Sequence, residues 1–460
     1  MNLPEEIKEA FAEGKRLFSC IQEFNGDATS LTIYQKGAQA ISREAERFYW
    51  ETPTKELTLV ALGSVLTFKE EDGTPASLLK YQKKMANLIY QNRLIYGAGA
   101  IVLGAFAFNQ EDAQCQYWSD LERGYLYLPR VLVTKGLEQN YVTFNFVAET
   151  LDELESQWFE GQAIMTTLEQ LVDDNHPVTL QKGYHIKQQE LAVDKWLTLV
   201  EETVSEIKDA ANPIKKIVLA RHLEILAEEV ISSEVVLANL AQQQTNTYLF
   251  ALVSGEVSFI GATPERLLSA DENYFKTAGI AGSAPRGKTS KEDQILSESL
   301  LTDPKNIYEH HVVIQRIENQ LADLIEGSMI QPKLSLLKNR DIQHLFIPIK
   351  GKRRNGVSLL EGLEALHPTP ALGGEPKEAA LDWIATKEFL GRGLYGAPVG
   401  WLNLVRDEGE FAVGIRSGIF SKNKGMLYGG CGIVEDSIPE LELKETWVKF
   451  QPMLRGVTGE

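Results

Sequence analysis

Cysteine is scarce in this sequence. The 460 residues include three cysteines, Cys20, Cys115 and Cys431, an odd number at wide spacings. No C-x-x-C pair occurs, so the sequence argues against both a disulfide framework and a zinc site. Sparse cysteine of this kind fits a reducing compartment, and we expect the protein to be cytoplasmic.

Long apolar runs and positive charge are also lacking. No stretch of roughly 18 apolar residues is present, so we expect no membrane span and no membrane partner. The segment Met1–Ile7 is acidic and lacks the apolar core of a signal peptide. Lys and Arg total 46 against 64 Asp and Glu, a net charge of −18 that disfavours nucleic acid and anionic membranes as partners. An anionic substrate would therefore need local positive charge from a metal ion, Arg or Lys.

The composition does provide material for a large core, with 43% hydrophobic and 24% charged residues. Strand-rich segments separated by a few long helices predict a mixed α/β fold of the α+β kind, not a strict βαβ repeat. No internal repeat or linker is visible, which favours one unit over residues 1–460. The expected strands are 57–63, 97–108, 125–129, 131–133, 141–146, 216–221, 247–253, 257–262, 341–350, 411–421 and 425–429, and the expected helices are 188–210 and about 304–325.

A glycine-spaced turn near the C-terminus, Tyr428–Val434, runs directly into a predicted helix start. Ser437 and Glu440 have the S-x-x-E spacing of a capping box, in which two side chains satisfy orphan amides of the first turn. Pro439 is tolerated inside that turn because the amide that proline lacks would be unpaired there anyway. The pattern predicts a capped helix immediately after the turn.

This predicted helix carries Glu442, Glu445 and Lys449 on one face. Carboxylate oxygens at a helix end suit a hard divalent cation such as Mg2+, and the lysine suits an anionic substrate. An ordinary solvated face of Glu and Lys residues is the alternative. In the helix after Pro304, Glu309 is likewise either a further metal carboxylate or a surface glutamate.

Lys216 and Glu265 are candidates for acid–base chemistry. Lys216 opens a buried strand, where it either extends to water or, among apolar neighbours, has a lowered pKa and acts as a general base. Glu265 follows a strand end at Gly261, where Thr263 and Pro264 begin a turn or short helix. It is either a carboxylate favoured by a helix dipole or a general acid.

Several segments rich in glycine and proline read as loops. Residues 277–289 form a predicted loop that lets the backbone approach a ligand closely. Gly282–Thr289 fits the P-loop string, but Pro285 removes one amide and no strand ending in Asp follows, so a plain loop or a different ligand loop is favoured. Segments 366–376 and 393–401 are rigid loops of small residues.

Arg416 lies in an apolar segment that reads as a strand, Phe411–Ser417. A guanidinium in such a setting needs a partner. The natural partner is a carboxylate that accepts two hydrogen bonds from the guanidinium. This carboxylate belongs either to a ligand or to a structural ion pair.

The order of these motifs resembles that of the chorismate-utilising enzymes, which include isochorismate synthase, salicylate synthase, anthranilate synthase component I and aminodeoxychorismate synthase. The resemblance covers about residues 190–455 and implies that this part is the catalytic region and that 1–189 is mainly scaffold. The N-terminal half matches only at 104–108 and 128–130. The motifs are Lys216–Arg221, Gly261–Leu268, Ala281–Gly287, Lys305-Asn306-x-x-Glu309, Leu366–Gly374, Ile415–Ser417 and Gly430–Thr446.

The resemblance implies a fold of two antiparallel sheets stacked face to face with helices outside. It also implies chorismate, a dianion, as substrate and Mg2+ as cofactor. The metal would be held by Glu309 and Glu445, with Glu442 close by or acting through water. The implied substrate-binding residues are Arg416, Lys449, the backbone near Gly430 and Gly432, and Gly282, Ser283, Ala371, Leu372 and Tyr395.

Within this family the nucleophile decides the product. The resemblance implies that Lys216 activates water for attack at ring C2 and that Glu265 protonates the leaving C4 hydroxyl, as in an isochorismate synthase. Anthranilate synthases use ammonia and lack this lysine, so no glutamine amidotransferase partner is expected. Salicylate synthase, anthranilate or aminodeoxychorismate synthase component I, and a non-catalytic chorismate-binding protein are the alternatives. The pathway is either menaquinone synthesis or a siderophore or salicylate route.

Two positions depart from the family pattern. Cys431 replaces the alanine often found between the two glycines, a small change that should keep the turn. Tyr395-Gly396-Ala397-Pro398 stands where relatives often place glycine directly before the proline, which puts the contacts of that loop in question.

Overall fold

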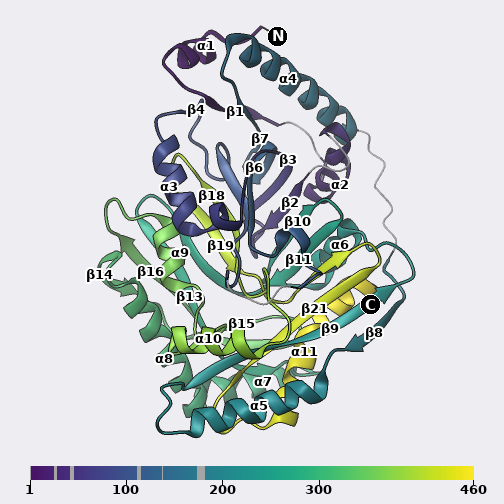
Figure 1. Ribbon diagram of the computed structural model, residues 1–460, viewed down its shortest axis with the longest axis vertical. Coiled ribbons are helices and arrows are strands. Elements are labelled where there is room, and N and C mark those ends of the chain that lie inside the picture. Colours follow the sequence, from purple (N-terminus) through teal and green to yellow (C-terminus); the bar gives the residue numbers. More distant parts are fainter. Residues whose placement is uncertain (1, 25–27, 42–45, 111–114, 137, 174–181) are drawn as a thin grey trace.

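The computed structural model describes residues 2–24, 28–41, 46–110, 115–136, 138–173 and 182–460. Figure 1 shows a strand-rich molecule with helices on its outside and the N-terminal elements α1 and α4 at one end. The helices are α1 (Glu5–Ala12), α2 (Ser30–Ile41), α3 (Pro75–Met85), α4 (Leu151–Asp173), α5 (Val193–Lys208), α6 (Ser233–Gln243), α7 (Ser290–Thr302), α8 (Pro304–Leu321), α9 (Leu359–Leu366), α10 (Lys377–Lys387) and α11 (Pro439–Thr458), with short 3-10 turns η1 (Glu70–Gly73) and η2 (Ser119–Leu121).

The strands of the N-terminal half are β1 (Leu17–Glu23), β2 (Arg47–Glu51), β3 (Leu57–Lys69), β4 (Ile89–Gln91), β5 (Ile101–Ala105), β6 (Tyr125–Gly136), β7 (Asn140–Val147) and β8 (Ile186–Glu190). The strands that follow are β9 (Lys216–Ala227), β10 (Tyr248–Ser254), β11 (Val257–Thr263), β12 (Arg266–Ala270), β13 (Tyr274–Pro285), β14 (Ile325–Ile330), β15 (Ser335–Lys338), β16 (Ile342–Arg353), β17 (Gly374–Glu375), β18 (Pro398–Asn403), β19 (Gly409–Val413), β20 (Ser417–Ser421) and β21 (Lys424–Ile433).

Strand pairing divides into two series that meet at β6 and β3. One series runs β16–β13–β12–β19–β18–β5–β6. The other runs β3–β2–β10–β11–β20–β21–β9–β8. All of these pairs are antiparallel, and β3 pairs with β6 to join the two series into one continuous sheet.

The two series pack on each other across a shared core. Tyr248 of β10 donates a hydrogen bond to Glu410 of β19 at 2.8 Å, which links the series directly. Phe250, Val399 and Phe411 are fully buried in the same cluster. The predicted fold of stacked antiparallel layers with outer helices is therefore confirmed, and the layers are two halves of one sheet.

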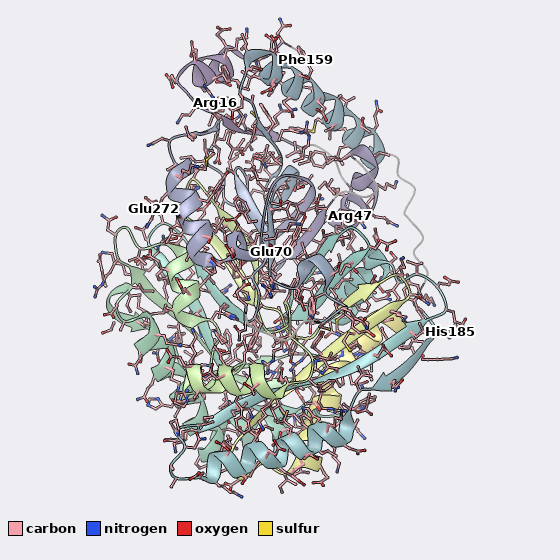
Figure 2. All side chains as sticks on the ribbon, in the orientation of Figure 1. Arg16, Arg47, Glu70, Phe159, His185 and Glu272 are labelled. Carbon is pink, nitrogen blue, oxygen red and sulfur yellow. The ribbon has the colours of Figure 1, made fainter. Side chains whose placement is uncertain are left out.

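Helices cover the outer faces of these layers. α8 packs on β13, α11 packs on β21 and α6, and α2 packs on β3. An ion pair between Arg47 of β2, labelled in Figure 2, and Glu234 of α6 ties a helix to the sheet. No helix in the described part of the chain is both long and apolar enough to cross a membrane.

Two predicted elements differ because sheet pairing outweighs local sequence preference. The expected helix 188–210 begins only at Val193, since Ile186–Glu190 pairs as β8 with the edge of β9. The expected loop 277–289 is a strand as far as Pro285, because β16 pairs along its whole length. A glycine-rich segment can join a sheet when its neighbour supplies the hydrogen bonds.

Three shorter predictions were wrong in detail. The capping box is absent: Ile438 precedes α11 without a side-chain cap, and the Ser437 hydroxyl accepts the Val434 amide instead. Of the two alternatives predicted at Thr263 and Pro264, a turn or a short helix, the helix is wrong, because strand β12 follows Glu265 directly. Segment 411–421 is two strands, β19 and β20, and Arg416 lies in the turn between them.

Candidate active site

Lys216 is the first residue of β9, beside β21. Ile217 lies opposite Ile433 and Val218 opposite Gly432 in this pair. The Lys216 side chain lies over Gly432, where an added Cβ would come within 2.6 Å of Lys216 Cε. A side chain at 432 would therefore make the end of the flexible lysine move.

The Lys216 amine is partly buried among charged groups. Burial lowers its pKa, because a low-dielectric setting disfavours the charged form, and Lys449 and Arg316 lower it further. Glu309 and Glu445 oppose that shift. An amine with a lowered pKa has a larger neutral fraction, which is the form that a general base requires.

Glu265 lies between β11 and β12, where its carbonyl accepts the Val413 amide at 2.9 Å. Burial raises the pKa of its carboxyl to about 7, although Arg416, Lys216 and Lys449 pull it down. A carboxyl with this pKa is protonated in a large fraction of molecules at neutral pH, which suits a general acid. Because Lys216 lowers the pKa of Glu265, the two side chains lie near enough to interact and belong to one candidate site.

The loop after α9 supplies one wall of the site. Ala371 and Glu265 line one pocket, together with Thr369 and Pro370. Leu372 differs, because its side chain is 6% exposed and belongs to the hydrophobic core. Of the two residues predicted here, the structure therefore places Ala371 at the pocket and packs Leu372 behind it.

Arg416 occupies a strained turn beside these groups. Its φ is +50°, a left-handed conformation that costs a residue other than glycine about 1–3 kcal/mol and persists only where the surroundings enforce it. Its carbonyl accepts the Ala262 amide at 3.1 Å. Burial lowers the pKa of Arg416, while Tyr395, Glu265 and other acidic groups raise it. Arg416 and Glu265 therefore lie near enough for their charges to interact.

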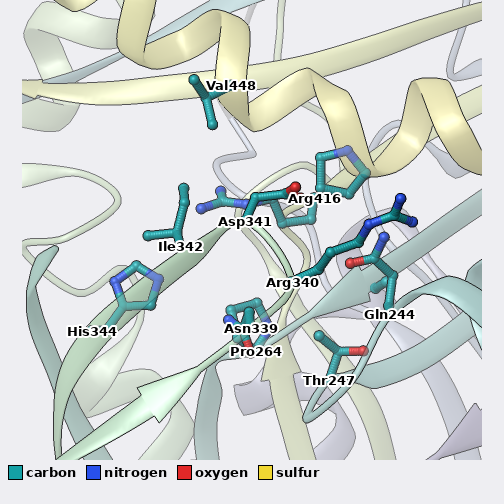
Figure 3. Close-up of a pocket in the computed structure, with 12 residues that line it drawn as sticks. Gln244, Thr247, Pro264, Asn339, Arg340, Asp341, Ile342, His344, Arg416 and Val448 are labelled. Atoms are coloured by element: carbon teal, nitrogen blue, oxygen red, sulfur yellow. The ribbon is translucent and has the colours of Figure 1, made fainter. Parts of the chain in front are cut away.

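His344 of β16 is a site residue that sequence reasoning missed. Its Nδ1 lies 2.8 Å from the Ser283 hydroxyl. Burial, with Arg416 and Lys449, lowers the pKa of His344 to about 3, so the imidazole is neutral at pH 7. His344, Ile342 and Arg416 line one pocket (Figure 3). The one signal in the sequence was an imidazole inside the expected strand 341–350.

Gly282 creates the bend that presents Ser283. The register of β13 shifts between Ala281 and Ser283, which marks a bulge. Gly282 has φ +72°, and an added Cβ would lie 2.9 Å from Asn306 Oδ1. Both the backbone conformation and the lack of space require glycine here.

Lys449, Gly430 and Tyr395 lie together on the β21 side of the site. Lys449 Nζ donates to the Gly430 carbonyl and to Glu445 Oε1, each at 2.6 Å. Tyr395 stacks on Tyr428 with ring centroids 5.0 Å apart. A Cβ on Gly430 would lie 3.0 Å from the Tyr395 hydroxyl, so the absence of a side chain at 430 leaves room for this hydroxyl.

The backbone amides of Gly430 and Gly432 point away from β9. Opposite them, the Val218 amide donates to Gly373 and the Ala220 amide to a side chain, so neither bonds to β21. Residues facing each other in an antiparallel pair have the same hydrogen-bonding character. The amides of both glycines therefore point to the side on which Lys449 contacts Gly430.

The three candidate metal carboxylates do not form one cluster. Glu309 of α8 and Glu445 of α11 both act on the pKa of Lys216, so they approach it from two helices. Glu442 lies near the Cys431 thiol, whose pKa is raised by burial and raised further by Glu442 and Glu445. Within the described ranges, no three His, Cys, Asp or Glu side chains are grouped closely enough to hold a metal ion. Mg2+ is usually held by one or two carboxylates plus waters and substrate, so Glu309 and Glu445 fit it better than a trio does.

Comparison with known proteins shows the family of this chain. A family model described as chorismate binding enzyme matches residues 5–458. The chain is 32% identical to isochorismate synthase MenF of Bacillus subtilis, over 94% of this chain and 91% of that protein. It is 30% identical to the salicylate biosynthesis isochorismate synthase of Pseudomonas aeruginosa, over 91% of this chain and 86% of that protein.

Solved structures show the same fold. The menaquinone-specific isochorismate synthase MenF of Escherichia coli superposes with a TM-score of 0.80 at 22% identity, covering 98% of this chain and 99% of that one. Anthranilate synthase component I of Streptococcus pneumoniae gives a TM-score of 0.71 at 20% identity, covering 87% and 92%. The chain therefore belongs to the chorismate-binding enzyme family.

Proposed function

We propose that this protein is an isochorismate synthase, an isomerase that converts chorismate into isochorismate. The observation that carries the proposal is a partly buried lysine of lowered pKa, Lys216, at one site with a carboxyl of raised pKa, Glu265. Water addition requires a base and loss of a hydroxyl requires an acid, so the pair fits both halves of the reaction. Two relatives that are at least 30% identical over more than 90% of this chain both carry isochorismate synthase in their names.

In the proposed reaction, neutral Lys216 takes a proton from water as its oxygen bonds to ring C2. The ring double bonds shift, the C4–O bond breaks, and Glu265 gives its proton to the departing hydroxyl, which leaves as water. Lys216 then holds the extra proton and Glu265 is ionised, so transfer of one proton through solvent resets the pair.

The cationic side chains would hold the dianionic substrate. Arg416 and Lys449, with the amides of Gly430 and Gly432, would take the enolpyruvyl carboxylate. Neutral His344 and the Ser283 hydroxyl offer hydrogen bonds beside them. Gly282, Ala371 and Tyr395 would shape the walls, and the core packing of Leu372 would support that of Ala371.

Glu309 and Glu445 would hold Mg2+, with Glu442 behind them beside Cys431. Bound there, Mg2+ would supply positive charge to the substrate's ring carboxylate. For Glu445 to take this role, its ion pair with Lys449 must loosen when substrate and metal enter, because the carboxylate and the ammonium are 2.6 Å apart.

Water as nucleophile removes the need for an ammonia source, so the protein would work without a glutamine amidotransferase partner. The free, buried thiols of Cys20, Cys115 and Cys431 favour the cytoplasm as its location. Menaquinone synthesis is the favoured pathway, in keeping with the names of the MenF relatives.

Product analysis tests the proposal. The purified protein is incubated with chorismate and Mg2+, with and without ammonium, and the products are separated by HPLC. Isochorismate as the sole product supports the proposal. Salicylate plus pyruvate would reassign the protein as a salicylate synthase, anthranilate formed with ammonium would overturn the water mechanism, and binding without turnover would point to a non-catalytic binding protein.

A further inference from the structure

Arg392 and Glu388 form a buried ion pair in the connection between α10 and β18. Their side chains are 1% and 5% exposed. Arg392 donates from Nε to Glu388 Oε2 at 2.8 Å and from Nη2 to Oε1 at 2.5 Å. Burying two charges costs free energy that an apolar pair would not cost, so the other bonds made by this pair matter.

The ion pair fills a gap along the edge of β9. β17 pairs with this edge at Lys216 and Ile217, and β8 pairs with it only from Leu223 onward. Between them, Arg392 Nη2 donates to the Val218 carbonyl at 2.6 Å. The Ala220 amide donates to Glu388 Oε1 at 2.7 Å. The two side chains thus take the place of a missing strand next to Lys216.

Arg392 also reaches two further parts of the site. Its Nη1 donates to the Leu372 carbonyl at 2.9 Å, in the loop that presents Ala371. Its own carbonyl accepts the Tyr395 amide at 2.8 Å. One residue therefore connects the strand of the base, the loop at the pocket and the stacked tyrosine.

We propose that Arg392 and Glu388 are positioning residues that fix the β9 backbone beside Lys216 and the loop carrying Ala371. This inference rests on the proposed function for its effect on catalysis. The planar guanidinium is essential to it, because Nε and both terminal nitrogens bond in different directions, which a single ammonium cannot reproduce.

Arg392→Lys is the test, and Arg353→Lys is its matched control. Arg353 is also buried, pairs with Asp407 and donates to the carbonyls of Val357 and Asp271. None of these interactions involves a candidate site residue. Each substitution removes several hydrogen bonds made by a buried guanidinium, so thermal stability should fall in both variants.

Only Arg392→Lys should lower kcat about 10- to 100-fold beyond the control, because a small misplacement of a catalytic group has effects of that size. Hydrogen exchange at Ala220 should also quicken in Arg392→Lys and stay unchanged in Arg353→Lys. Equal losses of kcat in the two variants, or unchanged exchange at Ala220, would overturn the inference.

Glu388→Gln, with Asp407→Asn as control, provides the same two readouts if Arg392→Lys fails to fold. Wild-type protein that makes no isochorismate would refute the proposed function alone. The exchange measurement would still decide whether the pair holds the β9 edge.

Discussion

The N-terminal half and the C-terminal region bury different kinds of residue. In the described part of residues 2–189, the fully buried polar side chains are uncharged, such as Ser19, Thr143 and Asn145, and no Asp, Glu, Lys, Arg or His is among them. The C-terminal region buries Arg221, His222, His310, His344, Glu388, Arg392, Glu408 and Glu410.

We propose that this difference separates a scaffold from a site. Long apolar strands such as β3 and β6 gain stability from packing alone. Buried charges cost stability unless they are paired, and they concentrate where chemistry needs perturbed pKa values. Mutations should therefore act mainly on stability in the first half and mainly on activity in the second.

The largest expected effect is that of Lys216→Ala. Removal of the base should lower kcat about 100- to 10,000-fold, the usual range for a general base, while chorismate still binds. Lys215→Ala is the control, because Lys215 is an exposed neighbour on the same strand edge. Steady-state kinetics and chorismate titration measure both effects, and near-normal turnover in Lys216→Ala would remove this residue from the role of base.

Glu309→Gln and Glu445→Gln should each raise the Mg2+ concentration needed for half-maximal activity about 10- to 100-fold. Each variant removes one charged oxygen ligand from a cation that relies on few protein carboxylates. Mg2+ titrations of activity measure the change, and Glu440→Gln, an exposed position in the first turn of α11, is the control. Unchanged Mg2+ dependence would exclude these two carboxylates from the metal site.

Leu132→Ala in β6 tests the scaffold side of the comparison. Leu132 is fully buried in the shared core, so the cavity should lower the free energy of unfolding by about 2–5 kcal/mol. Denaturant unfolding measures this loss. The kcat of the remaining folded enzyme should change less than twofold, and a large loss of kcat would show that the halves are not separable in this way.

The smallest effect concerns Glu265 and pH. Its folded-state pKa of about 7 lies above the ordinary 4.5, so its contribution to stability is present at low pH and is lost as pH rises through about 7. Glu265→Gln cannot ionise and should be about 1–2 kcal/mol more stable than wild type at pH 8.5, with a smaller difference at pH 5. Denaturant unfolding of both proteins at pH 8.5 and pH 5 measures this difference in stability. The same difference at both pH values would argue against a buried carboxyl.

The same group should shape the activity profile. Since the acid works only when protonated, kcat/KM should fall as pH rises through about 7. A profile without the basic limb would remove Glu265 from the role of acid.

Sequence reasoning was strongest where a residue's role follows from local pattern. Strand β10, the start of β9 at Lys216 and the start of α8 after Asp303 were predicted close to their observed bounds, because a short run of apolar residues and a proline at a helix start are local signals. It failed at β8 and β13, where the neighbouring strand decided the structure. It also missed His344, since one imidazole within a strand has no distinctive spacing.

The sequence by itself determined the family and the candidate residues, because their order and chemical types survive without coordinates. Whether these residues meet, and in which protonation states, was decided only by tertiary structure. Lys216 and Glu265 are 49 positions apart in the numbering. Their pKa values shift mainly because the packed fold excludes water from both side chains. The gap at the edge of β9 that Arg392 and Glu388 fill likewise exists only once β17 and β8 have paired with that strand.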